Sequence, residues 1–512
     1  MKAVRSVALL VLVLSRLGCS DAPERMVRDA SDVAEPTHDT SAPTDAETDV
    51  AIEVHDDSDA PADVDEVAEA EVDEPADVIE VGPDANDTAI EDTVTLTDAT
   101  EDVLSPRFIR GELRLERRRP NPTRSALQAP EEVPLAGRDV IVSRRDETLG
   151  VARTDADGRF VLALDGGTPL PAGASIELLV VAASPLMANA APAITILDGA
   201  NVTFPSATNV PIVASRVWAW SFEGTLAAGD DTDLGALVID IPHGSGAMQL
   251  LLDLEHAWTR ATTFFGTTDV PTLGVLWSPA VTPPCLSCYF PAPWGPLTLR
   301  TNGLLTATFD RAMFLSGADA APHHWTPSLS GHELGHWVMD VFSRLPPIGG
   351  AHAWSSLVAP SLAWSEGFAT FYAQWSLSDG EVDARFFTEQ QNIQYWIDLE
   401  RIGTGVTTDQ SSLGFTFPLP DTSGPLTQPI NEGIVAATLW DLYDDMSEAD
   451  HDTVALGDTT LATIDTQRMH DAALDRGAPD PDLVDYLDAH VCAGRALDAL
   501  FGFPWTGPAT CP

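Results

Sequence analysis

The chain has 512 residues and a formal net charge of −51, with 78 Asp and Glu against 27 Lys and Arg. This length allows two or three domains, each with a hydrophobic core. The acidic balance argues against nucleic acid as a partner, because proteins bind nucleic acids through basic surfaces.

The first residues, MKAVRSVALLVLVLSRLGCS, combine a basic start with a short apolar run. This pattern is typical of a secretory signal peptide over residues 1–19, and no later segment has the roughly 18 apolar residues of a membrane helix. Gly18-Cys19 resembles a bacterial lipoprotein cleavage site, although Arg16 departs from that pattern. We expect a protein exported to the cell envelope and anchored to the outer membrane or cell surface only by lipid on Cys19. The alternative is an ordinary signal peptide and a secreted protein.

Residues 20–105 contain 29 Asp and Glu but only two Arg, and they include no aromatic residue. Such a segment cannot bury enough apolar surface to offset the entropy that a chain loses on folding. We therefore predict a disordered acidic linker that acts as a stalk. Cation binding by its carboxylates is the alternative.

Residues 106–243 are predicted to form an all-β sandwich. Runs rich in β-branched and aliphatic residues, such as GRDVIVSRR, GRFVLAL and ASIELLVVAA, alternate with turn formers such as DADG and PAG. PLAGRDVIV followed by TDADGRFVL resembles the carboxypeptidase regulatory-like modules, which have a transthyretin-like fold of seven strands. The resemblance implies a spacer or binding module without chemistry of its own.

The pattern changes at residue 244. GAMQLLLDLEHAWTRATTFFG has apolar residues at helical spacing, and TLGVLWSP and LLTATFDRAMFL are typical of strands. Helices are then expected around residues 326–344, 361–377 and 431–445. Strands followed by helices indicate an α+β domain over residues 244–512.

Four cysteines follow Cys19, and an even number in an exported chain indicates disulfides. We expect Cys492 and Cys511 to close a C-terminal loop, and Cys285 and Cys288 to form a local bridge. A redox or zinc-binding role for the latter pair and other pairings are the alternatives.

The segment SGHELGHW places His332 and His336 four positions apart in a predicted helix, and therefore on one face of it. Two imidazoles so placed can bind one metal ion at about 2.0–2.1 Å. Glu333 lies about 100° round the helix from His332, where its carboxylate can stand beside a metal-bound water without binding the metal.

A catalytic zinc site needs a third protein ligand and an open fourth position. A third histidine six residues after the second is excluded, because Phe342 stands there. Glu366 lies thirty positions after His336, in the apolar and aromatic segment LAWSEGFATFYAQW. Burial of an unpaired carboxylate in such a helix is unfavourable, and a metal ion would remove this penalty. Glu366 is therefore the candidate third ligand.

HELGH together with WSEGFA resembles the gluzincin metallopeptidases, and most of all their aminopeptidase N branch. The resemblance covers residues 325–380. It implies a zincin-like fold with three zinc ligands and a general base: His332, His336, Glu366 and Glu333. Ser365 stands where that branch has asparagine, and Thr370 stands where the thermolysin branch has aspartate. The chain lacks the Gly-Ala-Met-Glu-Asn segment that recognises substrate amino termini in this branch, so aminopeptidase activity is not implied.

The segment NEGIVAATLWDLYDD carries two further candidates, Glu432 and Tyr443. They share a helix face but are eleven residues apart, so about 16 Å separates them along the axis and both cannot touch one metal ion. Tyr443 could donate its hydroxyl to the oxyanion, as a tyrosine does in the resembled family, and Glu432 could orient a ligand histidine. Packing and a helix-terminal acid are the alternatives. His323, His324 and His352 are expected to be loop histidines.

These patterns predict a zinc-dependent metallopeptidase that hydrolyses a peptide or protein. Glu333 would take a proton from a zinc-bound water as it attacks the peptide carbonyl, and would pass that proton to the leaving amine. The alternative is a surface lipoprotein for adhesion or scaffolding, with a structural or vestigial zinc site. Hydrolysis of a non-peptide substrate is a further alternative.

Overall fold

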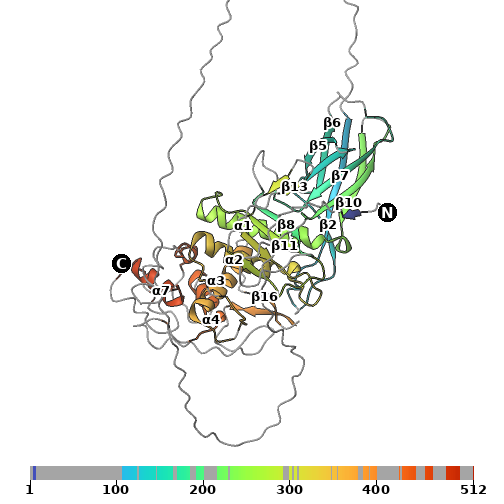
Figure 1. The fold of residues 1–512 in the computed structure, drawn as a ribbon. Coiled ribbons are helices and arrows are strands. Elements are labelled where there is room, and N and C mark those ends of the chain that lie inside the picture. Colours follow the sequence, from blue (N-terminus) through green and yellow to red (C-terminus); the bar gives the residue numbers. More distant parts are fainter. Residues whose placement is uncertain are drawn as a thin grey trace, which may run out of the picture. The chain divides into compact units, whose positions relative to one another are not determined.

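The computed structural model describes residues 4–6 and, with gaps, residues 107–511 (Figure 1). The longer gaps are 165–169, 185–191, 201–215, 292–298, 379–384, 400–425, 445–455, 465–479 and 498–510. The predicted acidic linker over residues 20–105 and Cys19, the predicted site of lipid attachment, lie outside the described residues, as does most of the predicted signal peptide. Within the described part, no helix is both long and apolar enough to cross a membrane.

Two sheets dominate the first part of the described chain. One has the strand order β1-β9-β7-β4-β5, and the other has the order β10-β2-β3 with β6 also paired to β2. The strands of the first are β1 (Val4–Ser6), β9 (Ala219–Thr225), β7 (Ser175–Val181), β4 (Asp139–Arg144) and β5 (Glu147–Arg153). Those of the second are β10 (Asp231–Ile239), β2 (Arg107–Arg117), β3 (Glu131–Pro134) and β6 (Arg159–Leu164).

Buried and exposed side chains alternate along β6 and β7, so each of these strands turns one face to the interior. Buried side chains of both sheets belong to one hydrophobic core. This arrangement is consistent with the predicted β-sandwich.

A third sheet has the order β12-β15-β11-β8. Its strands are β12 (Cys288–Phe290), β15 (Arg311–Phe314), β11 (Leu273–Trp277) and β8 (Ile194–Asp198). β8 lies within the residues predicted for the sandwich, yet it pairs in parallel with β11. β8 is buried without alternation, and this burial pattern suits a strand of a parallel sheet that is covered on both faces. The predicted boundary at residue 243 is therefore crossed by strand pairing.

The four longer helices fall where the sequence predicts them: α1 (Ser245–Phe265), α2 (Pro327–Phe342), α3 (Pro360–Leu377) and α4 (Glu432–Tyr443). Proline at the first position starts both α2 and α3, where a missing N–H is harmless. Two further described helices are α5 (Thr459–Ala462) and α7 (Leu483–Cys492), and two 3₁₀ turns span Ile241–His243 and His323–Trp325. One hairpin consists of β13 (Leu299–Thr301) and β14 (Leu305–Ala307). Another consists of β16 (Arg385–Gln390) and β17 (Ile393–Asp398).

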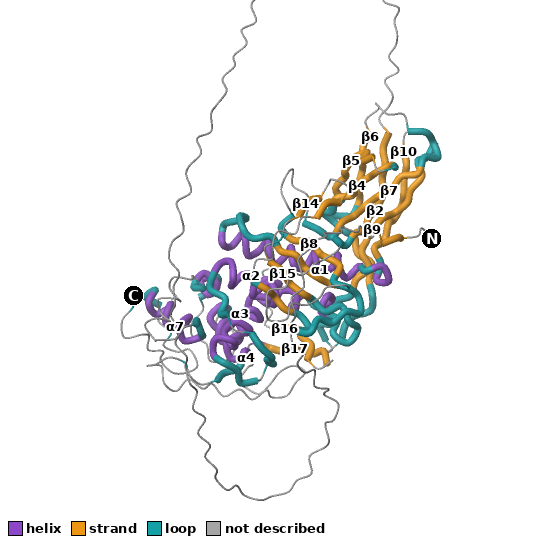
Figure 2. Tube along the Cα trace, in the orientation of Figure 1, coloured by secondary structure: helices purple, strands orange, loops and turns teal. Residues whose placement is uncertain are grey.

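α3 contacts both α2 and α4, and all three lie among the purple helices of Figure 2. Small residues let the backbones approach closely. A Cβ atom on Gly335 of α2 would lie 2.7 Å from Ala369 Cα, and one on Gly367 of α3 would lie 2.4 Å from Val435 Cβ. The first approach brings the histidines of α2 close to the carboxylate of α3, and the second brings α3 close to the start of α4.

Both expected cysteine pairs are at disulfide-bonding distance. The Cα atoms of Cys285 and Cys288 are 6.0 Å apart, and those of Cys492 and Cys511 are 5.3 Å apart. The predicted pairing is confirmed.

Candidate metal centre

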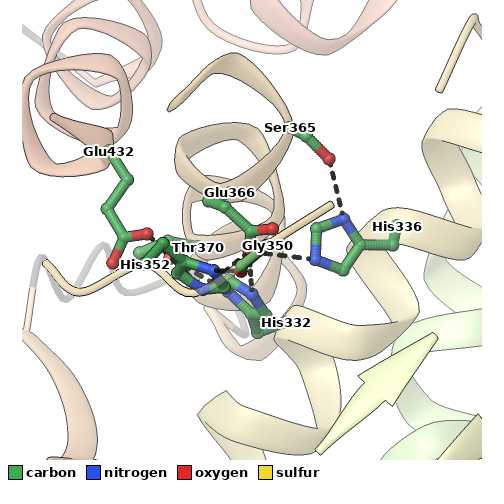
Figure 3. A network of polar contacts seen from close by, with 8 residues as sticks. All are labelled: His332, His336, Gly350, His352, Ser365, Glu366, Thr370 and Glu432. Atoms are coloured by element: carbon green, nitrogen blue, oxygen red, sulfur yellow. Dashed lines mark hydrogen bonds and ion pairs between the residues drawn. The ribbon is translucent and has the colours of Figure 1, made fainter. Parts of the chain in front are cut away.

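Three histidines converge on one carboxylate oxygen of Glu366 (Figure 3). Nε2 of His332 lies 3.1 Å from Glu366 Oε2, and Nε2 of His336 lies 3.2 Å from it. His352 Nε2 lies 3.2 Å from the same oxygen. The structure thus brings together the three predicted ligands from α2 and α3. It adds His352, which the sequence predicts as an ordinary loop histidine.

The cluster is buried except on the side of His352. Side-chain exposure is 13% for His332 and 9% for both His336 and Glu366, whereas it is 32% for His352. The site therefore reaches solvent past the loop that joins α2 to α3.

The opposite ring nitrogen of each histidine contacts an oxygen atom. Nδ1 lies 3.0 Å from Thr370 Oγ1 in His332, 3.1 Å from Ser365 Oγ in His336, and 3.0 Å from the Gly350 carbonyl oxygen in His352. A carbonyl only accepts hydrogen bonds, so Nδ1 of His352 donates, and hydroxyl oxygens can accept in the same way. All three rings can then turn an unprotonated Nε2 towards Glu366, which is the state that a metal ligand requires.

Sequence reasoning missed the two hydroxyl partners. Ser365 and Thr370 differ from the residues that the resembled branches have at these positions, and that difference alone indicates no role. They lie one residue before and four residues after Glu366 on α3, so they flank the carboxylate on the helix face that meets α2. A hydroxyl one turn beyond a candidate ligand is the signal that could have identified Thr370.

The donor set of His332, His336 and Glu366 fits a zinc ion. Two imidazoles and one carboxylate are a typical set for catalytic zinc. Ligand atoms that bind one ion tetrahedrally at about 2.0–2.1 Å are about 3.3–3.4 Å apart. The observed separations of 3.1 and 3.2 Å between Nε2 and Oε2 are close to this value. These ligand atoms all lie within 4.8 Å of one another.

The protonation states of His332 and Glu366 suit a cation, whereas in His336 and His352 burial is outweighed by the charge of Glu366, which raises the pKa of both. Burial lowers the pKa of His332 to about 4, so this ring is neutral at neutral pH. Burial alone would raise the pKa of Glu366, but the nearby His336 and His332 outweigh it and hold that pKa well below its ordinary value. A neutral imidazole and an ionised carboxylate are the forms that bind metals.

Glu333 lies in the buried part of the same helix turn. Burial is the largest cause that raises the pKa of its carboxyl to about 7, with His336 opposing the shift and Glu366 adding to it. A carboxylate with a pKa near neutrality is matched to the work of a general base.

Glu432 joins the cluster, whereas Tyr443 does not. Glu432 is the first residue of α4, and its Oε2 lies 3.7 Å from His352 Nε2. Tyr443 is the last residue of that helix, and its ring packs against Trp440 and Phe371 with centroids 5.5 and 6.0 Å apart. The helix separates the two ends by about 16 Å. The structure therefore places the Tyr443 ring against aromatic neighbours, and its contact with an oxyanion stays a prediction from the sequence.

His323 and His324 lie in a 3₁₀ turn and are not part of the cluster. His323 Nδ1 contacts Ser287 Oγ at 2.7 Å. His324 packs between Trp277 and Trp325, and burial lowers its pKa to about 3. These contacts are structural.

No family model matches the chain, and no curated protein matches it. Among solved structures, the 5-hydroxyisourate hydrolase of Klebsiella pneumoniae is similar to part of the chain. The match covers 26% of this chain and 90% of that chain, with 16% sequence identity and a TM-score of 0.13. At these values the similarity carries no argument about fold or function.

Proposed function

We propose that the protein is a zinc-dependent metallopeptidase of the gluzincin type. The observation that carries this proposal is the convergence of His332 Nε2 and His336 Nε2 on one oxygen of Glu366, at 3.1 and 3.2 Å. His332, His336 and Glu366 would hold the ion. Two imidazoles and one carboxylate leave a position open for a reactant, whereas structural zinc sites are usually closed by four protein ligands.

Zinc, when bound, supplies Lewis acidity that lowers the pKa of water towards about 7 and polarises a carbonyl group. The protein supplies the proton transfers. Glu333 accepts a proton from the attacking water and gives it to the nitrogen of the leaving amine. The peptide would enter on the side of His352, which is the most exposed of the three imidazoles.

The substitution Glu333→Gln tests this division of labour. The variant keeps the shape of the side chain but cannot accept the proton, so it should retain zinc and lose hydrolysis by at least about 100-fold, the usual weight of general base catalysis. Cleavage of casein and of a peptide library, together with zinc content, measures both effects.

Wild-type protein treated with a chelator and then resupplied with Zn²⁺ is the matched control, and it should lose and regain activity. Hydrolysis that survives in Glu333→Gln would remove the proposed mechanism. Zinc binding without cleavage of any peptide by the wild-type chain would favour the adhesion or scaffolding alternative.

A further inference from the structure

We propose that the protein binds a second divalent cation, held by His352, Glu366 and Glu432. The inference rests on the proposed function in one respect, because Glu366 would be shared with the zinc ion. The five side chains fall into two groups of potential ligands, His332–His336–Glu366 and His352–Glu366–Glu432, and within each group the ligand atoms lie within 4.8 Å of one another.

The separations in the second group suit a metal ion. His352 Nε2 lies 3.2 Å from Glu366 Oε2 and 3.7 Å from Glu432 Oε2. Ligand atoms bound at about 2.0–2.2 Å are roughly 3 Å apart at a right angle and more at wider angles. Both distances therefore fall in the range for neighbouring ligands of one ion. The second distance is too long for a hydrogen bond.

Glu432 supplies the independent observation. Its residue exposure is 7%, and its Oε2 accepts no hydrogen bond from the described residues. Figure 3 shows its carboxylate pointing from α4 towards His352 and Glu366. A buried carboxylate oxygen without a hydrogen bond is unfavourable unless a cation or a proton neutralises it.

His352 presents the matching donor. Its Nδ1 is 3.0 Å from the Gly350 carbonyl oxygen, which only accepts, so the hydrogen of a neutral ring is on Nδ1. The lone pair of Nε2 then faces two carboxylate oxygens that carry lone pairs themselves. These lone pairs repel one another, and a cation bound between the three atoms would attract all of them. A proton on Nε2 would also remove the repulsion, and the number of bound zinc ions distinguishes a cation from a proton.

All three histidine Nε2 atoms face the same oxygen, Oε2 of Glu366. This oxygen has two lone pairs, so it can serve both ions. Carboxylates that bridge ions roughly 3.5–4 Å apart are found in hydrolytic enzymes with two metals. Nitrogen and carboxylate donors favour ions such as Zn²⁺, Mn²⁺ and Co²⁺. The second ion would fix the loop between α2 and α3 to the start of α4, next to the solvent-facing side of the site.

The number of bound ions tests the proposal. The full chain, freed of metal by a chelator, is titrated with Zn²⁺ by calorimetry, and its zinc content is measured after desalting. We expect two equivalents in the wild type, one in Glu432→Gln and one in His336→Ala. Glu366→Gln should weaken both sites. Asp253→Asn removes a carboxylate on α1, outside the cluster, and should keep two equivalents.

A second readout can be taken first on the wild-type protein. Wild-type protein loaded with Mn²⁺ should give the electron paramagnetic resonance signal of two exchange-coupled ions, and Glu432→Gln should give that of an isolated ion. One zinc equivalent in the wild type, lost in His336→Ala but kept in Glu432→Gln, would overturn the second site and leave the peptidase proposal intact. No bound zinc in the wild type would overturn both. Two equivalents in Glu432→Gln would show that the second ion binds elsewhere and contradict the inference.

Discussion

Ser365 and Thr370 hold the rings of His336 and His332 from the side opposite to Glu366. Hydrogen bonds of this kind fix the tautomer and the direction of a ligand imidazole, and they raise its basicity. Both hydroxyls come from α3, the helix that also carries the carboxylate. One helix thus carries one proposed ligand and the groups that contact the other two proposed ligands.

Removal of either hydroxyl should weaken metal binding. We expect Ser365→Ala and Thr370→Ala to lower zinc affinity about 10- to 100-fold, the usual effect of losing a partner of a ligand histidine. Competition with a chromogenic chelator measures this affinity. Thr262→Ala removes a buried hydroxyl on α1 that bonds only to backbone carbonyls, and it should change nothing. Unchanged affinity in both α3 variants would show that the hydroxyls do not orient zinc ligands.

Single residues also show which parts of the site the sequence can predict and which it cannot. His332, His336 and Glu366 could be proposed because helical periodicity places the first two on one face and because a carboxylate is unusual in an aromatic helix. His352 has no such signal, because it lies in an irregular loop whose path depends on contacts far away in sequence. One of these is the antiparallel bridge between Val358 and Ile430.

At the scale of helices, the site depends on the close contact between α2 and α3. Gly335 meets the backbone of Ala369, and Gly331 lies against Ala373 one turn away. Gly331 and Gly335 are four residues apart and therefore lie on the same face of α2, where neither has a side chain. His332 and His336 each follow one of these glycines in the sequence, so the close contact between the helices brings both imidazoles near Glu366.

Gly335→Ala should disturb this contact. The added Cβ would lie 2.7 Å from Ala369 Cα, and a backbone atom cannot move aside as a flexible side chain can. We expect a loss of about 1–3 kcal/mol in the free energy of unfolding, together with weaker zinc binding, although alanine is otherwise the better helix former. Denaturant unfolding and chelator competition give the two quantities.

Gly349→Ala is the matched control, because a Cβ there meets no atom within 4 Å. It should leave both quantities unchanged. If Gly335→Ala is as stable as the wild type, α2 and α3 do not pack closely at Gly335.

The elements themselves were largely predictable, because periodicity depends on local sequence. The four long helices and most sandwich strands lie where the sequence predicts them. β8 could not be assigned to its sheet, since pairing with β11 is decided by residues about eighty positions away. The hairpin of β16 and β17 was not predicted at all. Strand partners, unlike strand positions, depend on the tertiary fold.

At the scale of the molecule, sandwich and helices share one hydrophobic core. Arg138 of β4 binds Glu255 of α1, with Nη2 2.6 Å from Oε2. Asp253 lies on the same helix, and burial raises the pKa of its carboxyl to about 6, although Gln249 and the charges of Arg119 and Arg117 oppose the shift. An ionised carboxylate here therefore destabilises the folded chain.

This shift predicts a pH dependence of stability. The folded state holds the Asp253 proton up to pH about 6 and the unfolded state only to about 3.8, so stability falls as pH rises between these values. Above pH about 6, ionisation of Asp253 has lowered the free energy of unfolding by about 2–3 kcal/mol. Asp253→Asn should recover that amount at pH 7 and almost nothing at pH 4, as measured by denaturant unfolding.

Asp157→Asn serves as the control, because the Asp157 side chain is 69% exposed and its replacement should change stability by less than about 0.5 kcal/mol at either pH. An equal effect of Asp253→Asn at both pH values would contradict the assignment.

We propose that α2 and α3 together hold zinc through two imidazoles and a carboxylate. Zinc K-edge X-ray absorption of the full chain, loaded with one equivalent, reports the ligand atoms themselves. We expect nitrogen and oxygen ligands at about 2.0–2.1 Å with the scattering pattern of at least two imidazoles. Sulfur ligands at about 2.3 Å, or a spectrum without imidazole scattering, would contradict it.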